Sequence, residues 1–148
     1  MSTEFKPIVR IAGKDLDGAR KVAYALTGIK GINIRLADVI VKKAEISPDK
    51  RLGFLSEAEI KRIEDVIMHI ADHVPAWLLN RRKDLETGKD LHLISSDLDL
   101  KVKEDIEKEK AMKSWRGYRH SYGLKVRGQR TRTTGRKGRT VGVKKRRK

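Results

Sequence analysis

The last 39 residues contain no acidic side chain, and this constrains the fold more than any other feature of the chain. Residues 110–148 carry 16 of the 36 Lys and Arg, so the whole formal net charge of +16 lies there. Residues 1–109 carry 20 basic and 20 acidic side chains, which cancel. A segment this basic, with few apolar residues, cannot bury a core of its own. The sequence therefore predicts a charge-balanced domain followed by a basic segment. Its partner is expected to be a polyanion, nucleic acid first and acidic lipid second.

Apolar residues recur at helical spacing in three segments before residue 75. The first helix is predicted to begin at Asp15 and to stop at Gly28, after a stretch at 5–13 that pairs as a strand or packs as a lead-in. A second short helix follows a turn, and Ser56 with Glu59 forms a capping box for the third helix. The apolar residues of the three helices are, in order, Leu16, Ala19, Val22, Ala23 and Leu26; Leu36, Val39, Ile40 and Ala44; and Ile60, Ile63, Val66, Ile67 and Ile70.

The region after the third helix is predicted to add an aromatic anchor and one more helix. Pro75 ends the third helix, and Trp77 with the two leucines after it is expected to fold back onto the core. Residues 86–94 are predicted to form a turn with a short extended stretch. Ser96 is expected to cap a mostly charged, solvent-facing helix that runs toward Trp115, where the Gly-rich segment ends it.

These assignments predict a mainly α protein in three parts. A globular helical domain over 1–95 contains a helix-hairpin-helix or helix–two-turn–helix element, a projecting charged helix spans 96–118, and an extended basic tail spans 119–148. The chain has no Cys, which excludes disulfides and thiolate metal sites. No apolar run reaches membrane-spanning length and no signal core precedes the domain, so we expect a soluble, intracellular protein.

The stretch IKGINIRLA, between the first two predicted helices, resembles the phosphate-binding turn of helix-hairpin-helix modules. Gly31 and Asn33 fall at the two glycine positions of that turn, and Asn tolerates a left-handed backbone better than other non-Gly residues. Such a turn aims backbone N–H groups at a phosphate, and Lys30 and Arg35 add positive charge. A plain helix–helix turn with Gly31 as terminator explains the residues equally well.

The order of residues at the start of the tail indicates RNA more than a simple electrostatic tether. Trp115, Tyr118, His120 and Tyr122 offer stacking surfaces among arginines, whose planar guanidinium groups match phosphate. Recurrent glycines allow close approach of the backbone to folded RNA, and threonines at 131–134 can donate to phosphate oxygens. Without acidic residues to pair with, the tail is expected to be disordered when free.

The stretch WRGYRHSYGLKVRGQRTRTTGRKGR resembles the C-terminal signature of the universal small-subunit ribosomal protein thirteen family. The signature runs Arg-x-x-Arg-His-x-x-Gly-x-x-x-Arg-Gly-Gln-Arg-Thr, and every fixed position is matched. The opening RIAGKDLDGARKVAYALTGIKGI resembles the start of the same family. The additional residues before the signature indicate its archaeal and eukaryotic branch. The matched positions are Arg116, Arg119, His120, Gly123, Arg127, Gly128, Gln129, Arg130 and Thr131.

The resemblance implies a structural role in the head of the small ribosomal subunit in the cytoplasm, without enzymatic activity, cofactor or metal. It implies that the globular part binds rRNA and faces a large-subunit protein across an intersubunit bridge. The tail would thread along rRNA toward peptidyl-site tRNA, and the family-nineteen head protein would be a neighbour. Fully extended, residues 120–148 span at most roughly 100 Å, which makes this reach feasible.

The resemblance also implies three sets of binding residues. Those expected to bind rRNA are Arg116, Arg119, His120, Lys125, Arg127, Gly128, Gln129, Arg130, Thr131, Arg132, Arg136, Lys137 and Arg139. The hairpin set for phosphate is Lys30, Gly31, Asn33 and Arg35. The set nearest to tRNA is Lys144, Lys145, Arg146, Arg147 and Lys148.

Two other classes of protein fit parts of the sequence. A DNA-repair enzyme would explain a helix-hairpin-helix turn, but the chain is short for a second, catalytic domain. His69 and His73 lie one helical turn apart, yet Ile70 stands where the zinc-protease pattern requires Glu, so core or surface histidines are favoured over a metal site. A chromatin-like DNA compactor explains the charge of the tail but not the match over residues 116–131.

Overall fold

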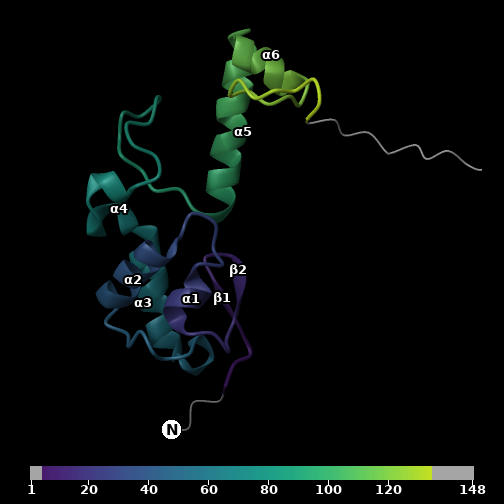
Figure 1. Ribbon diagram of the computed structural model, residues 1–148. Coiled ribbons are helices and arrows are strands. Elements are labelled where there is room, and N and C mark those ends of the chain that lie inside the picture. Colours follow the sequence, from purple (N-terminus) through teal and green to yellow (C-terminus); the bar gives the residue numbers. More distant parts are fainter. Residues whose placement is uncertain (1–4, 135–148) are drawn as a thin grey trace, which may run out of the picture. The chain divides into compact units, whose positions relative to one another are not determined.

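The computed structural model describes residues 5–134, and it confirms a mainly helical protein with one small sheet (Figure 1). The chain divides into two compact units, residues 1–100 and residues 101–148. Helix α5 (Ser95–Ala111) begins in the first unit and ends in the second. The division into parts at residues 95 and 118 stays a prediction. Within the described residues no helix is long and apolar enough to cross a membrane.

The chain opens with a β-hairpin, so the prediction that a helix begins at Asp15 is wrong. β1 (Ile8–Ile11) pairs antiparallel with β2 (Lys14–Asp17), joined by a two-residue turn in which Ala12 and Gly13 have φ of 48° and 75°. Positive φ at both turn residues matches the twist of paired strands. Leu16 alternates into the core from β2 instead of standing on a helix face. The strand alternative for residues 5–13 is confirmed.

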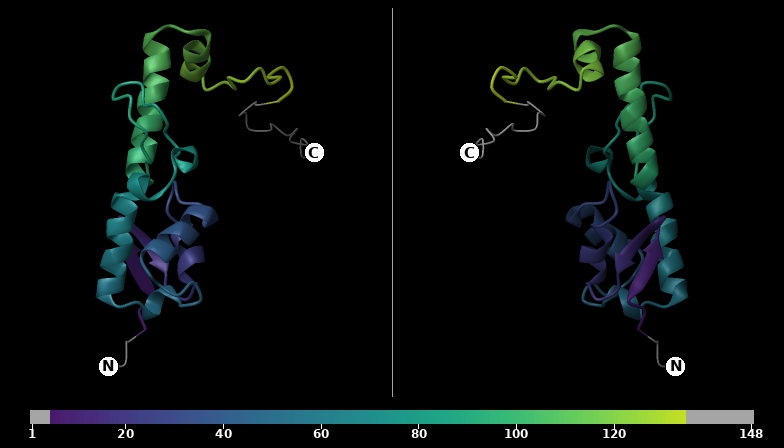
Figure 2. Two further views of the ribbon diagram at one scale, coloured as in Figure 1. Left: turned by 90° about the vertical axis from the view of Figure 1, so that its left-hand side faces the viewer. Right: turned by 90° about the vertical axis from the view of Figure 1, so that its right-hand side faces the viewer.

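Helices α1 and α2 form the next part of the first unit. α1 (Val22–Leu26) begins later than predicted, because the chain first makes a turn in which Asp17 Oδ1 accepts a hydrogen bond of 2.9 Å from the Ala19 N–H. α2 (Ile34–Lys43) buries Leu36, Ala37, Ile40 and Val41, of which the helical spacing predicted Leu36 and Ile40. α2 packs on α1 and on α3, and β2 contacts α1 (Figure 2). The predicted pair of helices around the hairpin is therefore confirmed.

The capping box predicted for the third helix is present at the start of α3 (Glu57–Met68). Ser56 Oγ accepts a hydrogen bond of 3.3 Å from the Glu59 N–H, and Glu59 Oε2 accepts one of 2.8 Å from the Ser56 N–H. Lys50 Nζ lies 2.8 Å from both carboxylate oxygens of Glu59. Burial alone would raise the pKa of Glu59, but the hydrogen bonds from Lys50 and Ser56 outweigh it and lower the pKa. The start of α3 is thus fixed by one carboxylate that accepts three hydrogen bonds from two groups, Lys50 Nζ and the Ser56 N–H.

The prediction that Trp77 anchors the core is wrong. α3 ends at Met68, and a separate short helix, α4 (Ile70–His73), ends before Pro75. η2 (Ala76–Leu78) then places Trp77 outside with 72% of its surface exposed. Leu79 takes the inward position instead and is 8% exposed. No aromatic side chain is buried among the described residues, and the core consists of Ile, Leu, Val and Ala. Because a 3-10 turn follows Pro75, Leu79 faces the core and Trp77 faces solvent.

The region after residue 94 forms two helices where one was predicted. α5 begins at Ser95, so Ser96 lies inside its first turn and is not the cap, and α5 has no fully buried residue, in line with the solvent-facing prediction. The chain then turns, and Trp115 opens a separate helix, α6 (Trp115–Ser121). Gly117 lies within α6 and does not end a helix. The first three residues of the tail therefore belong to α6.

Replacement of Ser56 by alanine is expected to destabilise the first unit by about 1 kcal/mol, because the helix loses its N-cap acceptor. The measurement is chemical denaturation followed by circular dichroism. Ser47→Ala is the matched control, since Ser47 is exposed and its hydroxyl makes no hydrogen bond to any residue in 5–134. Equal midpoints for the two variants would show that the capping box does not stabilise α3.

Candidate nucleic-acid interface

The hairpin between α1 and α2 uses a left-handed residue at one of its two predicted glycine positions. Gly31 has φ of 94°, whereas Asn33 is extended, with φ of −101° and ψ of 170°. Asn33 caps α2 instead, because its Oδ1 accepts a hydrogen bond of 2.7 Å from the Ile34 N–H. Ile29 and Ile32 are buried on either side of Gly31. Asparagine at the second position is therefore explained by capping and not by backbone strain.

The open side of Gly31 is filled by the protein itself. A Cβ on Gly31 would lie 2.5 Å from the Leu93 carbonyl oxygen and 3.2 Å from Ile94 Cα. The Ser95 N–H donates to the Lys30 carbonyl at 2.9 Å, and Lys30 Nζ lies 2.5 Å from Asp99 Oδ2. Residues 93–99 thus pack on the hairpin and pair its lysine. Arg35, in the first turn of α2, remains exposed.

Asn80 and His92, which sequence reasoning missed, hold this packing together. The Asn80 side chain bonds both polar groups of the Leu93 backbone, at 2.7 Å to the carbonyl and 2.9 Å from the N–H. The Asn80 N–H donates to His92 Nδ1 at 3.3 Å, and His92 Nε2 lies 3.0 Å from the Gly31 carbonyl. His92 Nδ1 accepts a hydrogen bond and so carries no proton, whereas Nε2 faces a carbonyl oxygen and must donate. His92 is therefore neutral, with its proton on Nε2. No sequence pattern marks a polar pair whose members are 12 residues apart.

Helix α6 packs back on the end of α5 through its glycine. A Cβ on Gly117 would lie 2.1 Å from the Glu109 carbonyl oxygen, so only glycine allows this approach. Ser114 caps α6, accepting a hydrogen bond of 3.0 Å from the Gly117 N–H. The Ser114 hydroxyl also lies 2.5 Å from Glu109 Oε2. One serine therefore joins the start of α6 to the last turns of α5.

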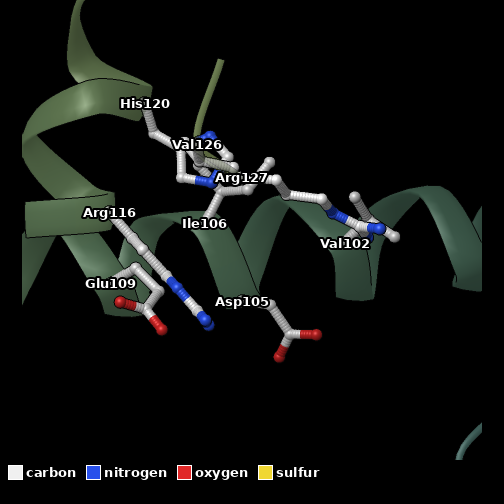
Figure 3. A pocket seen from close by; sticks show the side chains of 8 residues that line it. All are labelled: Val102, Asp105, Ile106, Glu109, Arg116, His120, Val126 and Arg127. Carbon is white, nitrogen blue, oxygen red and sulfur yellow. The ribbon is translucent and has the colours of Figure 1, made fainter. Parts of the chain in front are cut away.

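An open cavity of about 780 Å³ lies between α5, α6 and the start of the extended tail (Figure 3). Asp105 and Glu109 line it from α5, Arg116 and His120 from α6, and Arg127 from the chain beyond. Figure 3 shows the Arg116 side chain extended toward the side where the two α5 carboxylates lie. The apolar part of the lining is Val102, Ile106 and Val126. Three predicted RNA-binding residues thus meet in one place, together with acidic residues that were not predicted there.

The other predicted RNA-binding residues within 5–134 do not line this cavity. The Arg119 guanidinium carbon lies 5.8 Å from the Trp115 ring centroid, and Arg119 Nε donates to the Lys125 carbonyl at 2.9 Å. Gln129 Oε1 accepts a hydrogen bond of 3.0 Å from the Arg127 N–H, around the left-handed Gly128. Arg130, Thr131 and Arg132 continue without helix or strand. The predicted Arg136, Lys137, Arg139, Lys144, Lys145, Arg146, Arg147 and Lys148 lie outside the described residues.

The histidines at 69 and 73 do not form a metal centre with other side chains. His69 lies between α3 and α4, and its Nδ1 is 3.1 Å from the Asp65 carbonyl oxygen. Across residues 5–134, no group of three or more His, Asp or Glu side chains could hold a metal ion.

The first unit is expected to lose stability as the pH falls below about 6.5, the ordinary pKa of histidine. Burial lowers the pKa of His92 in the fold and outweighs the opposing effect of the Gly31 carbonyl. The unfolded chain therefore binds a proton at His92 more readily than the folded chain does. The stabilisation by neutral His92 is complete above the ordinary pKa, and it is lost as the pH falls from the ordinary pKa to the lower pKa of the folded state. Thermal unfolding across this range checks the slope. His92→Gln should flatten it; an unchanged slope would exclude His92 as its source.

Gly117→Ala is expected to detach α6 from α5. The new methyl overlaps the Glu109 carbonyl, and overpacking of this kind costs roughly 1–3 kcal/mol. A seven-residue helix is marginal without its packing partner. Amide hydrogen exchange in α6 should therefore accelerate about tenfold or more. Lys108→Ala, which changes an exposed side chain near the end of α5, is the control. Exchange rates like those of the wild type would contradict the assigned packing.

Comparisons with known proteins place the chain in one family. A family model described as ribosomal protein S13/S18 matches residues 10–137. The chain is 56% identical to the small ribosomal subunit protein uS13 of Staphylothermus marinus, over 97% of this chain and 96% of that protein. It is 57% identical to the uS13 of Saccharolobus solfataricus, over 97% and 87%, and 53% identical to that of Methanopyrus kandleri, over 96% of each chain. Through the acid-free signature after α5 and this full-length similarity, the chain belongs to the ribosomal protein S13/S18 family and is of archaeal type.

Proposed function

We propose that this protein, a structural and non-enzymatic constituent of the small subunit of cytoplasmic ribosomes, binds the rRNA of that subunit through α6 and the tail. The observation that carries the proposal is the absence of any acid after Glu109, in a segment whose first helix, α6, contacts α5 closely at Gly117. The positive charge therefore begins next to a defined contact with α5. Phosphate contacts from such a segment position a protein on RNA.

The family signature supports a specific path for the tail over a diffuse electrostatic contact. The Arg119 guanidinium is held by a hydrogen bond to the Lys125 carbonyl. The Arg127 backbone N–H bonds the Gln129 side chain, and Gly128 gives the tail a defined bend. A guanidinium that is already held loses less conformational entropy when it binds phosphate than a mobile one does. The full proposed rRNA set is the one given by the signature, from Arg116 to Arg139.

The hairpin set is proposed as a second, weaker phosphate contact. Gly31 packs against the chain and Lys30 pairs with Asp99, so these two contribute little to a phosphate from outside. Arg35 is exposed in the first turn of α2, where the helix dipole favours an anion. Asn33, with its Oδ1 bonded to the Ile34 N–H, presents its remaining polar groups at the same end. Arg35 is therefore the main contributor in this set.

The finer placement of the protein in the ribosome is also a proposal. We infer that the first unit contributes to an intersubunit bridge with a large-subunit protein and that the family-nineteen head protein is a neighbour. The last five residues, Lys144 to Lys148, would reach toward peptidyl-site tRNA. These proposals follow from the resemblance of the signature and of the N-terminal stretch to the family.

The rRNA proposal predicts selective, salt-dependent binding by the tail. Replacement of Arg127, Arg130 and Arg132 by glutamine should lower the slope of log affinity against log salt by roughly 2 to 3, since each lost phosphate contact contributes about 0.7 to 0.9. The measurement is filter binding of the full chain to small-subunit head rRNA. Replacement of the exposed Lys43, Lys61 and Arg62 of the first unit removes the same charge and is the control.

The same assay separates this function from the alternative of a DNA compactor. We expect small-subunit rRNA to outcompete random duplex DNA near physiological salt, because the order of the tail residues matches an RNA-binding signature. Equal affinity for the two nucleic acids would contradict the ribosomal role. Equal slopes for the tail and first-unit variants would show that the tail does not carry the binding.

A further inference from the structure

Helix α6 and its C-cap residue, Tyr122, carry three aromatic rings in contact along one face. Trp115, Tyr118 and Tyr122 stand at positions i, i+3 and i+7, which fall on the same side of a helix. The Trp115 and Tyr118 rings are nearly parallel, at 8° with centroids 5.6 Å apart, and the Tyr118 and Tyr122 centroids are 4.7 Å apart at 49°. We call these three residues the aromatic ladder. The rings hold one another in a fixed arrangement.

The aromatic ladder does not contribute to a core. Trp115, Tyr118 and Tyr122 are 71%, 52% and 65% exposed, while Gly117, which packs on α5, is buried. α6 therefore packs through its glycine and turns its large rings to solvent. Exposed aromatic surface of this extent, on a helix with a fixed position, marks a site of interaction.

Positive charge surrounds the aromatic ladder, and this indicates the chemistry of its occupant. The Arg119 guanidinium carbon lies 5.8 Å from the Trp115 ring centroid, and its Nε bond to the Lys125 carbonyl keeps it there. No acidic residue occurs from residue 110 onward. An occupant that suits both features has flat apolar faces and negative charge. Nucleotides with unpaired bases combine the two.

We propose that the aromatic ladder binds single-stranded RNA by stacking unpaired bases on its exposed rings, with the adjoining phosphates on Arg119 and Lys125. This inference rests on the proposed rRNA binding and specifies where an unpaired segment is held. A base-paired helix suits the site less well, because its bases are stacked on one another and their faces are covered. An uncharged apolar protein surface suits it less well too, because it would desolvate Arg119 without a counter-charge.

The first experiment measures the fluorescence emission of Trp115. The chain has two tryptophans, so Trp77→Phe leaves Trp115 as the single emitter in the full chain. Titration with a single-stranded oligouridylate of roughly 12 nucleotides should quench Trp115 emission saturably, since site sizes for such binding are about 4–16 nucleotides. The same sequence annealed to its complement should quench it less and at higher concentration. Equal quenching by both forms, or none by either, would overturn the proposal.

The second experiment tests the rings by substitution in the full chain. Tyr118→Leu and Tyr122→Leu keep an apolar side chain on the helix but remove the flat face. Each should weaken binding of the oligouridylate on the order of 5- to 150-fold, the range for loss of one stacked base. Tyr122→Phe should retain the affinity. Tyr24→Leu is the matched control, because Tyr24 is 60% exposed on α1 and lies outside the aromatic ladder.

The outcomes distinguish this inference from the function on which it rests. If the leucine variants bind both oligouridylate and small-subunit rRNA as the wild type does, the stacking role is wrong and rRNA binding by the tail stands. If the wild type does not select small-subunit rRNA over duplex DNA, the proposed function itself fails. If the variants bind RNA normally but do not retain another small-subunit protein, the occupant is a protein and the proposal is overturned.

Discussion

The close approach of α6 to α5 at Gly117 determines what the second unit can present. A side chain there would overlap the Glu109 carbonyl oxygen, 2.1 Å from the ideal Cβ position. Because the glycine face is turned inward, the large residues of α6 divide between two other directions. Arg116 and His120 line the cavity against α5, and the aromatic ladder faces solvent. The contact between Gly117 and α5 thus leaves α6 with two different surfaces. One carries Arg116 and His120, and the other carries the aromatic ladder.

A glycine also organises the first unit, although for a different purpose than the sequence indicated. The sequence explains Gly31 equally well in two ways, as a residue that lets a phosphate approach the backbone or as the terminator of a plain helix–helix turn. In the structure its open side is filled by the backbone of residues 93 and 94, held there by Asn80 and His92. The hairpin therefore packs against the segment that leads into α5. Its glycine is required for packing whether or not a phosphate binds at Arg35.

The parts of the fold that the sequence predicted are those set by local rules. The capping box at Ser56 and the apolar face of α2 depend on neighbours three or four residues away, and both are present. The predictions that were wrong concern features that the helical spacing does not mark. The strand at Leu16 depends on pairing with Val9, and the orientation of Trp77 depends on an irregular 3-10 turn. For the candidate site, the signature named residues of α6 and of the chain that follows it. It could not show that Arg116, His120 and Arg127 share a cavity with two carboxylates.

Those carboxylates change how the positive charge of the second unit acts. Asp105 and Glu109 line the same cavity as Arg116 and Arg127, so part of the positive charge is opposed within the protein. Opposite charges in an open cavity attract modestly, since water screens them. A phosphate entering the cavity would meet two negative groups, whereas Arg119 and Lys125 lie outside its lining and the chain after Arg127 supplies no acidic side chain. RNA phosphates should therefore favour Arg119, Lys125 and the tail over the interior of the cavity, and α6 also contributes through its rings. The acids of α5 thus direct where along the chain the RNA backbone lies, a distinction that net charge alone cannot make.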